Sequence, residues 1–187
     1  MGMKRQFKYS VWCTALTFVL GMAMLACEQS IIDISKPPPN WENEIENGGE
    51  FFIDFRYKID NGSITILRYN GKGGLVSIPS EIDGIPVTSI GIYSFRETKL
   101  TDIIIPDSIT LIEKGSFYGN QLTSVIIPNR ISSIADLTFI YNKLISVVIP
   151  NGVTSIGKHA FEWNQLNSVT IPDSVTSLGI MHFAKIR

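Results

Sequence analysis

The chain has few residues of the kinds that build reactive or metal-binding sites. Its 187 residues include only two cysteines, Cys13 and Cys27, and both lie near the N-terminus. The rest of the chain therefore holds no thiol and can form no disulfide. Any domain formed there must be stabilised by packing alone.

Histidines are equally few. His159 and His182 are the two in the chain, and neither has a cysteine or a fixed carboxylate at the spacing of a metal site. We interpret both as ordinary surface or turn residues and predict no metal and no cofactor. The carboxylates are scattered and no nucleophile–base pair can be named, so the sequence predicts no catalytic residue and no enzyme.

Charge of a single sign is also lacking. The chain has 16 lysines and arginines against 17 aspartates and glutamates, a net charge of −1 at pH 7. Nucleic-acid-binding domains need a basic stripe, so we do not expect a nucleic-acid partner. Long stretches with helical spacing of apolar residues are absent too, which makes long helices improbable.

What the chain does have is a repeat of 22 residues. The dipeptide Ile-Pro recurs at this interval from Ile105-Pro106 to Ile171-Pro172, and an earlier copy, Ile78-Pro79, lies 27 residues upstream. Phenylalanines keep the same interval from Phe95 to Phe183. A fixed period of this length is the signature of a solenoid, in which each coil buries its apolar side only against its neighbours. Repeats usually make surfaces, so the period favours binding over catalysis.

One coil, residues 144–165, predicts two short strands and a bend. The β-branched run Leu144–Ile149 predicts a strand that ends at a proline, with Val148 facing outward and both its neighbours inward. A second alternating run, Val153–Ile156, follows an Asn-Gly turn. Phe161 then points inward at the bend into the next coil. Stacked coils would align these inward residues in continuous columns.

A row of asparagines, Asn120, Asn142 and Asn164, recurs two residues before each strand leucine. Polar side chains at a tight bend usually hydrogen-bond backbone groups of adjacent coils, because such bends leave N–H and C=O groups unpaired. We interpret the row as a structural ladder. A row that binds a sugar or an ion is the alternative.

The repeat resembles a known family. Its units carry an Ile-Pro dipeptide, a V-T-S-I-G motif at Val153–Gly157 and an Ala-Phe pair at Ala160-Phe161, in the order and spacing of the BspA-like, treponemal-type leucine-rich repeats. Three segments, Ile64–Ile66, Tyr69–Gly74 and Ile78–Gly91, are together similar to the first, extended unit of that family, and the resemblance covers about residues 51 to 187. The last unit departs from the pattern around Ile180–Phe183. The resemblance implies surface or secreted bacterial proteins, several of them adhesins for host matrix proteins, and no fixed set of functional residues.

The predicted fold is therefore mainly β, a leucine-rich-repeat solenoid of about five 22-residue coils over residues 78–187. An N-terminal β-hairpin cap is expected over residues 51–77, because apolar and polar residues alternate from Phe51 to Ile59 and Asn61-Gly62 is a tight-turn signal. Such a cap would cover the first coil and its unpaired strand edge. The C-terminal end has no equivalent cap in its sequence.

The N-terminus predicts export. Basic residues, from Lys4 to Lys8, precede an apolar stretch from Val11 to Leu25, as in a secretion signal over residues 1–26. The motif Met24–Cys27 resembles a bacterial lipobox, which implies that Cys27 is acylated and anchors the protein to a membrane. An uncleaved membrane anchor is the alternative. Residues 27–50, with a run of three prolines, predict a flexible tether. The expected location is the cell envelope, at the outer surface or the periplasmic face.

A candidate binding face follows from the outward strand positions. We call Ile104, Ile126, Val148 and Thr170 the outward row; near it we place three bend aromatics, Tyr118, Tyr141 and Trp163. Exposed apolar rows with polar rims often mark interaction sites. The alternative is that β-branched residues simply suit a sheet surface and that the aromatics cover the core.

The predicted function is an exported, lipid-anchored binding module for adhesion or protein–protein interaction. Its partner would be a host matrix protein or another envelope protein. The alternative function is a structural lipoprotein that faces the periplasm and has no host ligand. A third reading is a truncated or decaying paralogue without a ligand, suggested by the short array and the irregular last unit.

Overall fold

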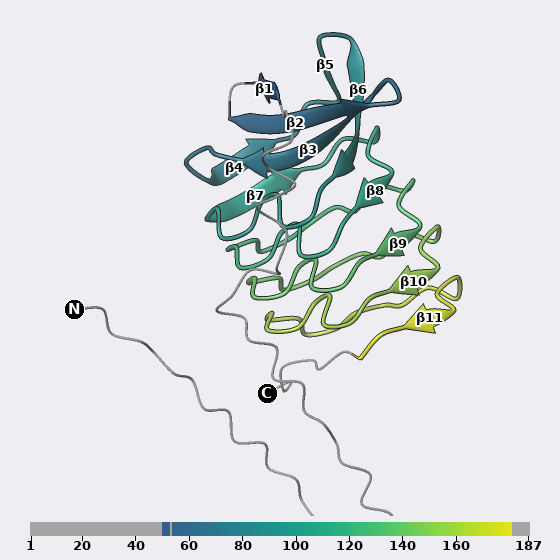
Figure 1. Cartoon of the computed structure of the whole chain (residues 1–187). Coiled ribbons are helices and arrows are strands. Elements are labelled where there is room, and N and C mark those ends of the chain that lie inside the picture. The colour runs from purple at the N-terminus through teal and green to yellow at the C-terminus, as the bar shows by residue number, and fades with distance from the viewer. Residues whose placement is uncertain (1–49, 53, 181–187) are drawn as a thin grey trace, which may run out of the picture. The chain divides into compact units, whose positions relative to one another are not determined.

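The computed structural model describes residues 50–52 and 54–180 (Figure 1), all within one compact unit. These residues form strands joined by turns and bends, with no helix among them, and hence none that could cross a membrane. The strands are β1 (Glu50–Phe52), β2 (Phe55–Asp60), β3 (Ser63–Tyr69), β4 (Gly74–Ser77), β5 (Glu81–Ile82), β6 (Ile85–Ile90), β7 (Leu100–Ile104), β8 (Leu111–Ile112), β9 (Ser133–Ile134), β10 (Ser155–Ile156) and β11 (Ser177–Leu178). The predicted signal peptide, Cys27, His182 and Phe183 lie outside the described residues.

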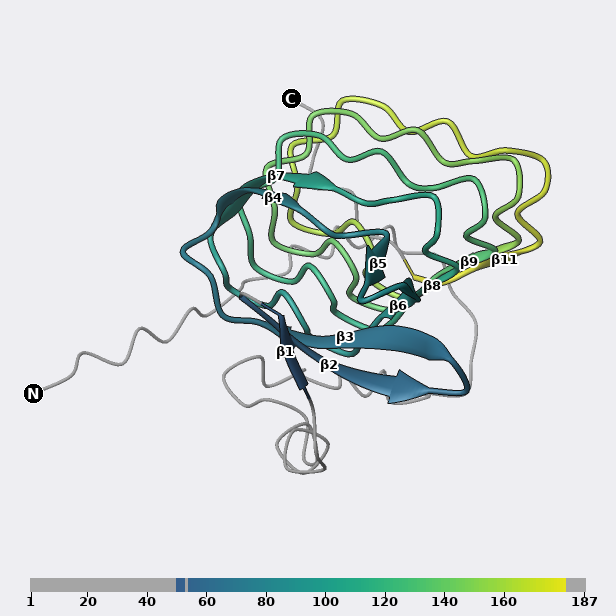
Figure 2. The ribbon, with the colours of Figure 1, turned by 90° about the horizontal axis from the view of Figure 1, so that it is seen from above.

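Two sheets of parallel strands run along the stack of coils. Along one side of the stack, β3, β6 and β8 pair in parallel, and β9, β10 and β11 form a further set of parallel strands beyond them. We call the two sets together sheet A. Sheet B begins with the parallel pair β4 and β7 and continues as parallel bridges that join Ile126, Val148 and Thr170. The view along the stack shows the coils superposed on one another (Figure 2). The predicted solenoid is confirmed.

The strands of sheet B are shorter than the sequence predicted. In the run Leu144–Ile149, only Val148 forms β-bridges, one to each neighbouring coil, in place of a strand of six residues. The backbone still bonds coil to coil there, as when the Ile145 N–H donates to the Thr123 carbonyl at 3.1 Å. Inward and outward residues alternate as expected, with Val147 and Ile149 buried and Val148 exposed.

The bend, which joins sheet A to sheet B in each coil, holds the centre of the core. Phe95, Phe117 and Phe139 are fully buried, and their rings stack with centroids 5.3 Å apart in each successive pair. Phe161 continues the column at 5.6 Å. Backbone N–H groups of one coil donate to carbonyls of the next along the whole bend, as from Phe117 to Thr138 at 3.0 Å. The column therefore lies inside a continuous backbone ladder, which leaves few bend groups unpaired.

Each bend turns by means of two left-handed residues, one on either side of the phenylalanine. The first position holds Tyr93, Gly115, Leu137 and His159; the second holds Glu97, Gly119, Tyr141 and Trp163; all have φ between 52° and 69°. Glycine adopts this conformation at no steric cost, and other residues do not. Only one of the four coils has glycine at both positions, so the stacking of the coils must hold the other bends in shape.

The 27-residue segment between Ile78-Pro79 and Ile105-Pro106 contains an insertion relative to the 22-residue repeats. Strands β5 and β6 pair antiparallel around a turn at Asp83 and Gly84, whose φ angles are 51° and 77°. This small hairpin accounts for the 27-residue interval between the first two Ile-Pro dipeptides, because the following coils pass directly from sheet B to sheet A.

The stack begins earlier than the boundary at residue 78 that the sequence suggested. Strands β2 and β3 form the predicted hairpin around Asn61 and Gly62, but β3 is the first strand of sheet A and β4 the first of sheet B. Tyr69 occupies the phenylalanine position of this coil, because its ring stacks on Phe95 at 5.5 Å. Phe55 of β2 then covers the column, with its ring 5.3 Å from that of Tyr69. β2 thus acts as the cap.

Candidate binding surfaces

The outward row lies on the exposed face of sheet B. Ile126 and Val148 are the two most exposed large hydrophobic side chains in the described part of the chain, at 84% and 79% of their full accessibility. Ile104 and Thr170 continue the row and are exposed as well. Exposed serines precede each of the last three members by two residues, at Ser124, Ser146 and Ser168. The row is thus an apolar strip with a hydroxyl-bearing border.

The three bend aromatics do not form one face. Tyr118 is only 7% exposed and packs with Leu137 and Ile140 in a small second core, so it is unavailable to a partner in this structure. Tyr141 is half-buried, and the exposed Trp163 stacks on it with ring centroids 5.9 Å apart. The cause lies in the spacing: Tyr118 follows its phenylalanine directly, whereas the other two stand two residues after theirs.

Arg96 is fixed against this aromatic cluster. Its guanidinium carbon lies 5.0 Å from the ring centroid of Tyr118 and 5.7 Å from that of Tyr93. Burial raises the pKa of both phenols, and the charge of Arg96 opposes this rise. Both tyrosines therefore stay neutral at neutral pH and present their ring faces to the cation. One Nη of Arg96 also contacts a carboxylate oxygen of Glu97 at 3.4 Å.

The asparagines bind backbone atoms of two coils at once. The Oδ1 of Asn142 accepts from the Leu122 N–H at 3.1 Å, and its Nδ2 donates to the carbonyls of Phe117 and Phe139 at 2.9 and 3.1 Å. Asn120 and Asn164 repeat this arrangement one coil to either side. Both the oxygen and the nitrogen of each asparagine amide are thus hydrogen-bonded to backbone atoms, which supports a structural role for the row over a ligand-binding role.

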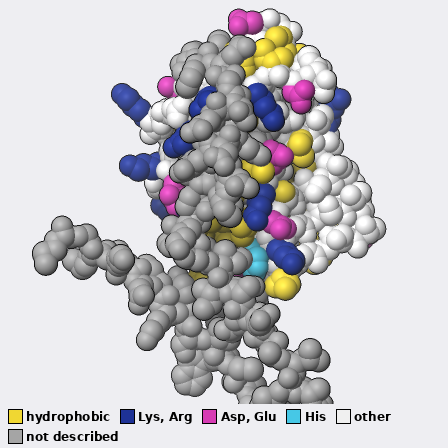
Figure 3. Space-filling model, viewed as in Figure 1, with side chains coloured by type: hydrophobic (Ala, Val, Ile, Leu, Met, Phe, Trp, Pro, Cys, Tyr) yellow, Lys and Arg dark blue, Asp and Glu magenta, His cyan; other side chains and the backbone are white. Residues whose placement is uncertain are grey.

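His159 is a bend residue whose Nδ1 contacts the Glu162 carboxylate. Within the described residues, no group of three histidine, cysteine or acidic side chains is arranged to hold a metal ion. On the face shown in Figure 3, the coloured basic and acidic side chains are interspersed and form no single-sign patch.

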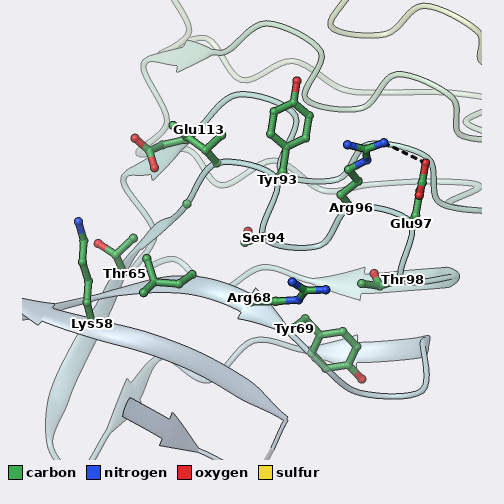
Figure 4. A pocket seen from close by; sticks show the side chains of 13 residues that line it. Lys58, Thr65, Arg68, Tyr69, Tyr93, Ser94, Arg96, Glu97, Thr98 and Glu113 are labelled. Atoms are coloured by element: carbon green, nitrogen blue, oxygen red, sulfur yellow. Dashed lines mark hydrogen bonds and ion pairs between the residues drawn. The ribbon is translucent and has the colours of Figure 1, made fainter. Parts of the chain in front are cut away.

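A cavity of about 310 Å³, which the sequence analysis did not predict, lies at the N-terminal end of the stack (Figure 4). Leu67 of β3 and the bend residues Ile92 and Tyr93 line it. Lys58 and Glu113 lie on one side, and Arg96 and Glu97 on the opposite side. Arg68, Thr65, Ser94 and Thr98 also line the cavity, so it combines three basic groups, two acidic groups and several hydroxyls.

The repeats match a described family. The profile of the BspA type leucine rich repeat region matches residues 76–187 in six copies, more than half of the chain. The chain belongs to the BspA-type leucine-rich repeat family. No curated protein matches the chain.

Solved structures of bacterial leucine-rich repeat proteins are similar to this BspA-type chain. One from Bacteroides ovatus has a TM-score of 0.57 at 25% identity, over 70% of this chain and 37% of that protein. The T. pallidum leucine-rich repeat protein has a TM-score of 0.55 at 25% identity, over 71% of this chain and 82% of that protein. The pneumococcal vaccine antigen PcpA shares the fold at 21% identity with a TM-score of 0.57, over 70% of this chain and 39% of its own. The chain thus spans less than half of two of these relatives.

Proposed function

We propose that the protein is an exported, lipid-anchored module that binds another protein through the outward row. The observation that carries this proposal is the exposure of Ile126 and Val148 side by side on sheet B. Apolar side chains exposed in a contiguous strip are a common mark of protein interaction surfaces. The repeat fold supports the same reading, because solenoids present extended faces for partners.

Sheet A supplies an internal comparison. The exposed positions just before its strands carry Thr110, Ser132, Thr154 and Thr176, and the next positions, within β8 to β11, carry Leu111, Ser133, Ser155 and Ser177. Seven of these eight side chains bear a hydroxyl, whereas the outward row of sheet B consists of Ile104, Ile126, Val148 and Thr170. Both sheets belong to the same coils and both rows face solvent. A preference of sheet surfaces for β-branched residues would be met by threonine on either side, so it does not explain the isoleucines and the valine. Selection for a partner explains them.

Replacing both Ile126 and Val148 by lysine tests the binding face. The double variant places two charges in the strip and should lose retention on the partner, since a buried unpaired charge opposes association. The measurement is binding to immobilised panels of host matrix proteins and of solubilised envelope proteins. The matched control is Ser132→Lys with Thr154→Lys, which puts the same charges on sheet A. Equal retention by both double variants would show that the outward row is not the binding face.

The lipid anchor is tested at Cys27. The variant Cys27→Ala should remain an unprocessed precursor and should incorporate no labelled fatty acid, because the thiol that accepts the lipid is gone. Cys13→Ala is the control and should be labelled like the wild type. A Cys27→Ala protein that is still labelled and processed would refute the lipobox assignment.

The alternative function, a structural lipoprotein facing the periplasm, differs in location. Protease added to intact cells digests a domain displayed at the surface and spares a periplasmic one. Protection from protease would favour the alternative, with an envelope protein as the partner of the same row.

A further inference from the structure

The cavity exists because the first bend is two residues shorter than the others. Ile66 and Ile90 occupy the same position in successive coils, because the carbonyl of each accepts a hydrogen bond from the next coil, from the N–H of Gly91 and of Glu113, respectively. Tyr69 and Phe95 also occupy the same position, because the N–H of each donates to the next coil, to the carbonyls of Ser94 and Ser116, respectively. Tyr69 stands three residues after Ile66, whereas Phe95 stands five residues after Ile90. The first coil therefore cannot cover the bend of the second, and the uncovered part lines the cavity.

Ser94 is a buried donor that the fold does not use. Its column continues as Ser116, Thr138 and Ala160, all buried. The hydroxyl of Ser116 donates to the Glu113 carbonyl, and that of Thr138 donates to the Ala135 carbonyl at 2.8 Å. Ser94 is 1% exposed, and its hydroxyl has no hydrogen-bond partner among the described residues. It lines the cavity and stands in the middle of the ring of side chains in Figure 4. An unpaired buried hydroxyl costs free energy unless a ligand pairs with it.

Arg96 adds a positioned cation. The rings of Tyr93 and Tyr118 hold its guanidinium, whose contact with Glu97 is long at 3.4 Å. Its Nε is buried, and no described residue accepts a hydrogen bond from it. A guanidinium has five N–H donors, so most of them remain for a ligand, and its planar fork suits a carboxylate.

The same end of the stack offers one acceptor. Lys114 and Asp136 occupy the position of Ile92 in the next two coils. Their backbone carbonyls each accept a hydrogen bond from a backbone N–H of the preceding coil, that of Tyr93 and that of Gly115, respectively. The short first bend has no residue to donate to Ile92, and no backbone bond to its carbonyl occurs in the described part of the chain. Ile92 lines the cavity together with the apolar Leu67. A backbone N–H of a ligand would suit this carbonyl.

We propose that this cavity binds an acidic side chain of an extended polypeptide, with the carboxylate held by the Ser94 hydroxyl and the Arg96 guanidinium. Together with Arg96, Lys58 and Arg68 place three cations against the two carboxylates of Glu97 and Glu113, so the lining has a net positive charge. The site lies away from the outward row and does not depend on it.

The test uses the full-length protein in a mild detergent and a labelled hexapeptide of alternating glutamate and leucine, capped at both ends. Fluorescence anisotropy at low salt measures its binding, and a matched peptide of glutamine and leucine is the ligand control. We expect the glutamine peptide to bind at least about tenfold more weakly, because hydrogen bonds to a charged group are the stronger ones. Ser94→Ala and Arg96→Gln should each weaken binding of the glutamate peptide by about tenfold.

Ser116→Ala is the matched control for Ser94→Ala. It lies in the same column one coil further on, and its hydroxyl already has a partner. Ser116→Ala should lower the thermal midpoint and leave peptide binding unchanged. Ser94→Ala should leave the midpoint unchanged or raise it, because it removes an unpaired hydroxyl, and alanine already occupies this column at Ala160. Arg130→Gln, an exposed cation that does not line the cavity, should have no effect on binding.

Three results would overturn the proposal. Equal binding of both peptides would exclude a carboxylate site. Equal binding of the glutamate peptide by the wild type, Ser94→Ala and Arg96→Gln would exclude the cavity. Displacement of the peptide by inorganic phosphate at equal concentration would reassign the cavity as a site for small anions. Failure of the Ile126→Lys, Val148→Lys protein to bind its protein partner, with peptide binding intact, would support two separate sites.

Discussion

The phenylalanine rings are the residues on which the coils most depend. Phe139 has its ring between those of Phe117 and Phe161, at 5.3 and 5.6 Å, and is fully buried. Large aromatic side chains bury more apolar area than any others. Since the described residues contain no cysteine, no disulfide compensates for a lost ring.

Phe139→Ala should lower the free energy of unfolding by about 3–5 kcal/mol, the usual cost of truncating a buried aromatic side chain. Val148→Ala is the control, and as an exposed change it should stay within about 0.5 kcal/mol. Urea unfolding followed by tyrosine and tryptophan fluorescence measures both. A near-neutral Phe139→Ala that loses partner binding would reverse the assignment of the column to the core.

The 22-residue repeat was enough to predict which side chains face inward. Val147 and Ile149 are buried and Val148 is exposed, as predicted. The left-handed bend positions were missed, although Gly115 and Gly119 stand in columns otherwise occupied by bulky residues. Such glycines were the available signal. Tyr118 was misplaced because one residue of difference after the phenylalanine turns a side chain from the surface into the second core.

At the scale of the element, the coil is held by contacts that its own sequence cannot complete. Each asparagine bonds its own bend and the preceding coil, so one side chain serves two elements. The cap shows the same dependence. Tyr69 replaces phenylalanine and lies 26 residues before Phe95, which hides the first coil from a search at a period of 22. Only the pairing of β3 with β6 and of β4 with β7 reveals it. The cavity was unpredictable for the same reason.

Asn142→Ala should destabilise the domain by about 1–3 kcal/mol, because it leaves the buried Leu122 N–H without its acceptor and removes one of the two asparagine donors to each of the Phe117 and Phe139 carbonyls. Asn164→Ala should cost less, since Asn164 is only partly buried. Thermal unfolding of the two variants checks this order. Unchanged stability together with lost binding of a sugar or an ion would instead support the ligand-binding alternative.

At the scale of the molecule, the stack has two exposed sheet faces of different chemistry and one uncovered bend. Apart from Leu111, the outward side chains of sheet A mostly bear hydroxyls, whereas sheet B carries the apolar outward row. The side chains of Ile126 and Val148 point to solvent and neither lines the cavity, so substitutions there should leave the cavity intact. This independence allows the outward row and the cavity to be tested separately.

The most direct test of the binding face is site-specific photo-crosslinking in the cells that make the protein. A photo-crosslinking amino acid replaces Ile126 on sheet B in one strain and Ser132 on sheet A in a second strain. We expect a discrete adduct of the domain with one other protein from position 126 and none from position 132. Adducts of the same size and yield from both positions, or none from position 126, would contradict it.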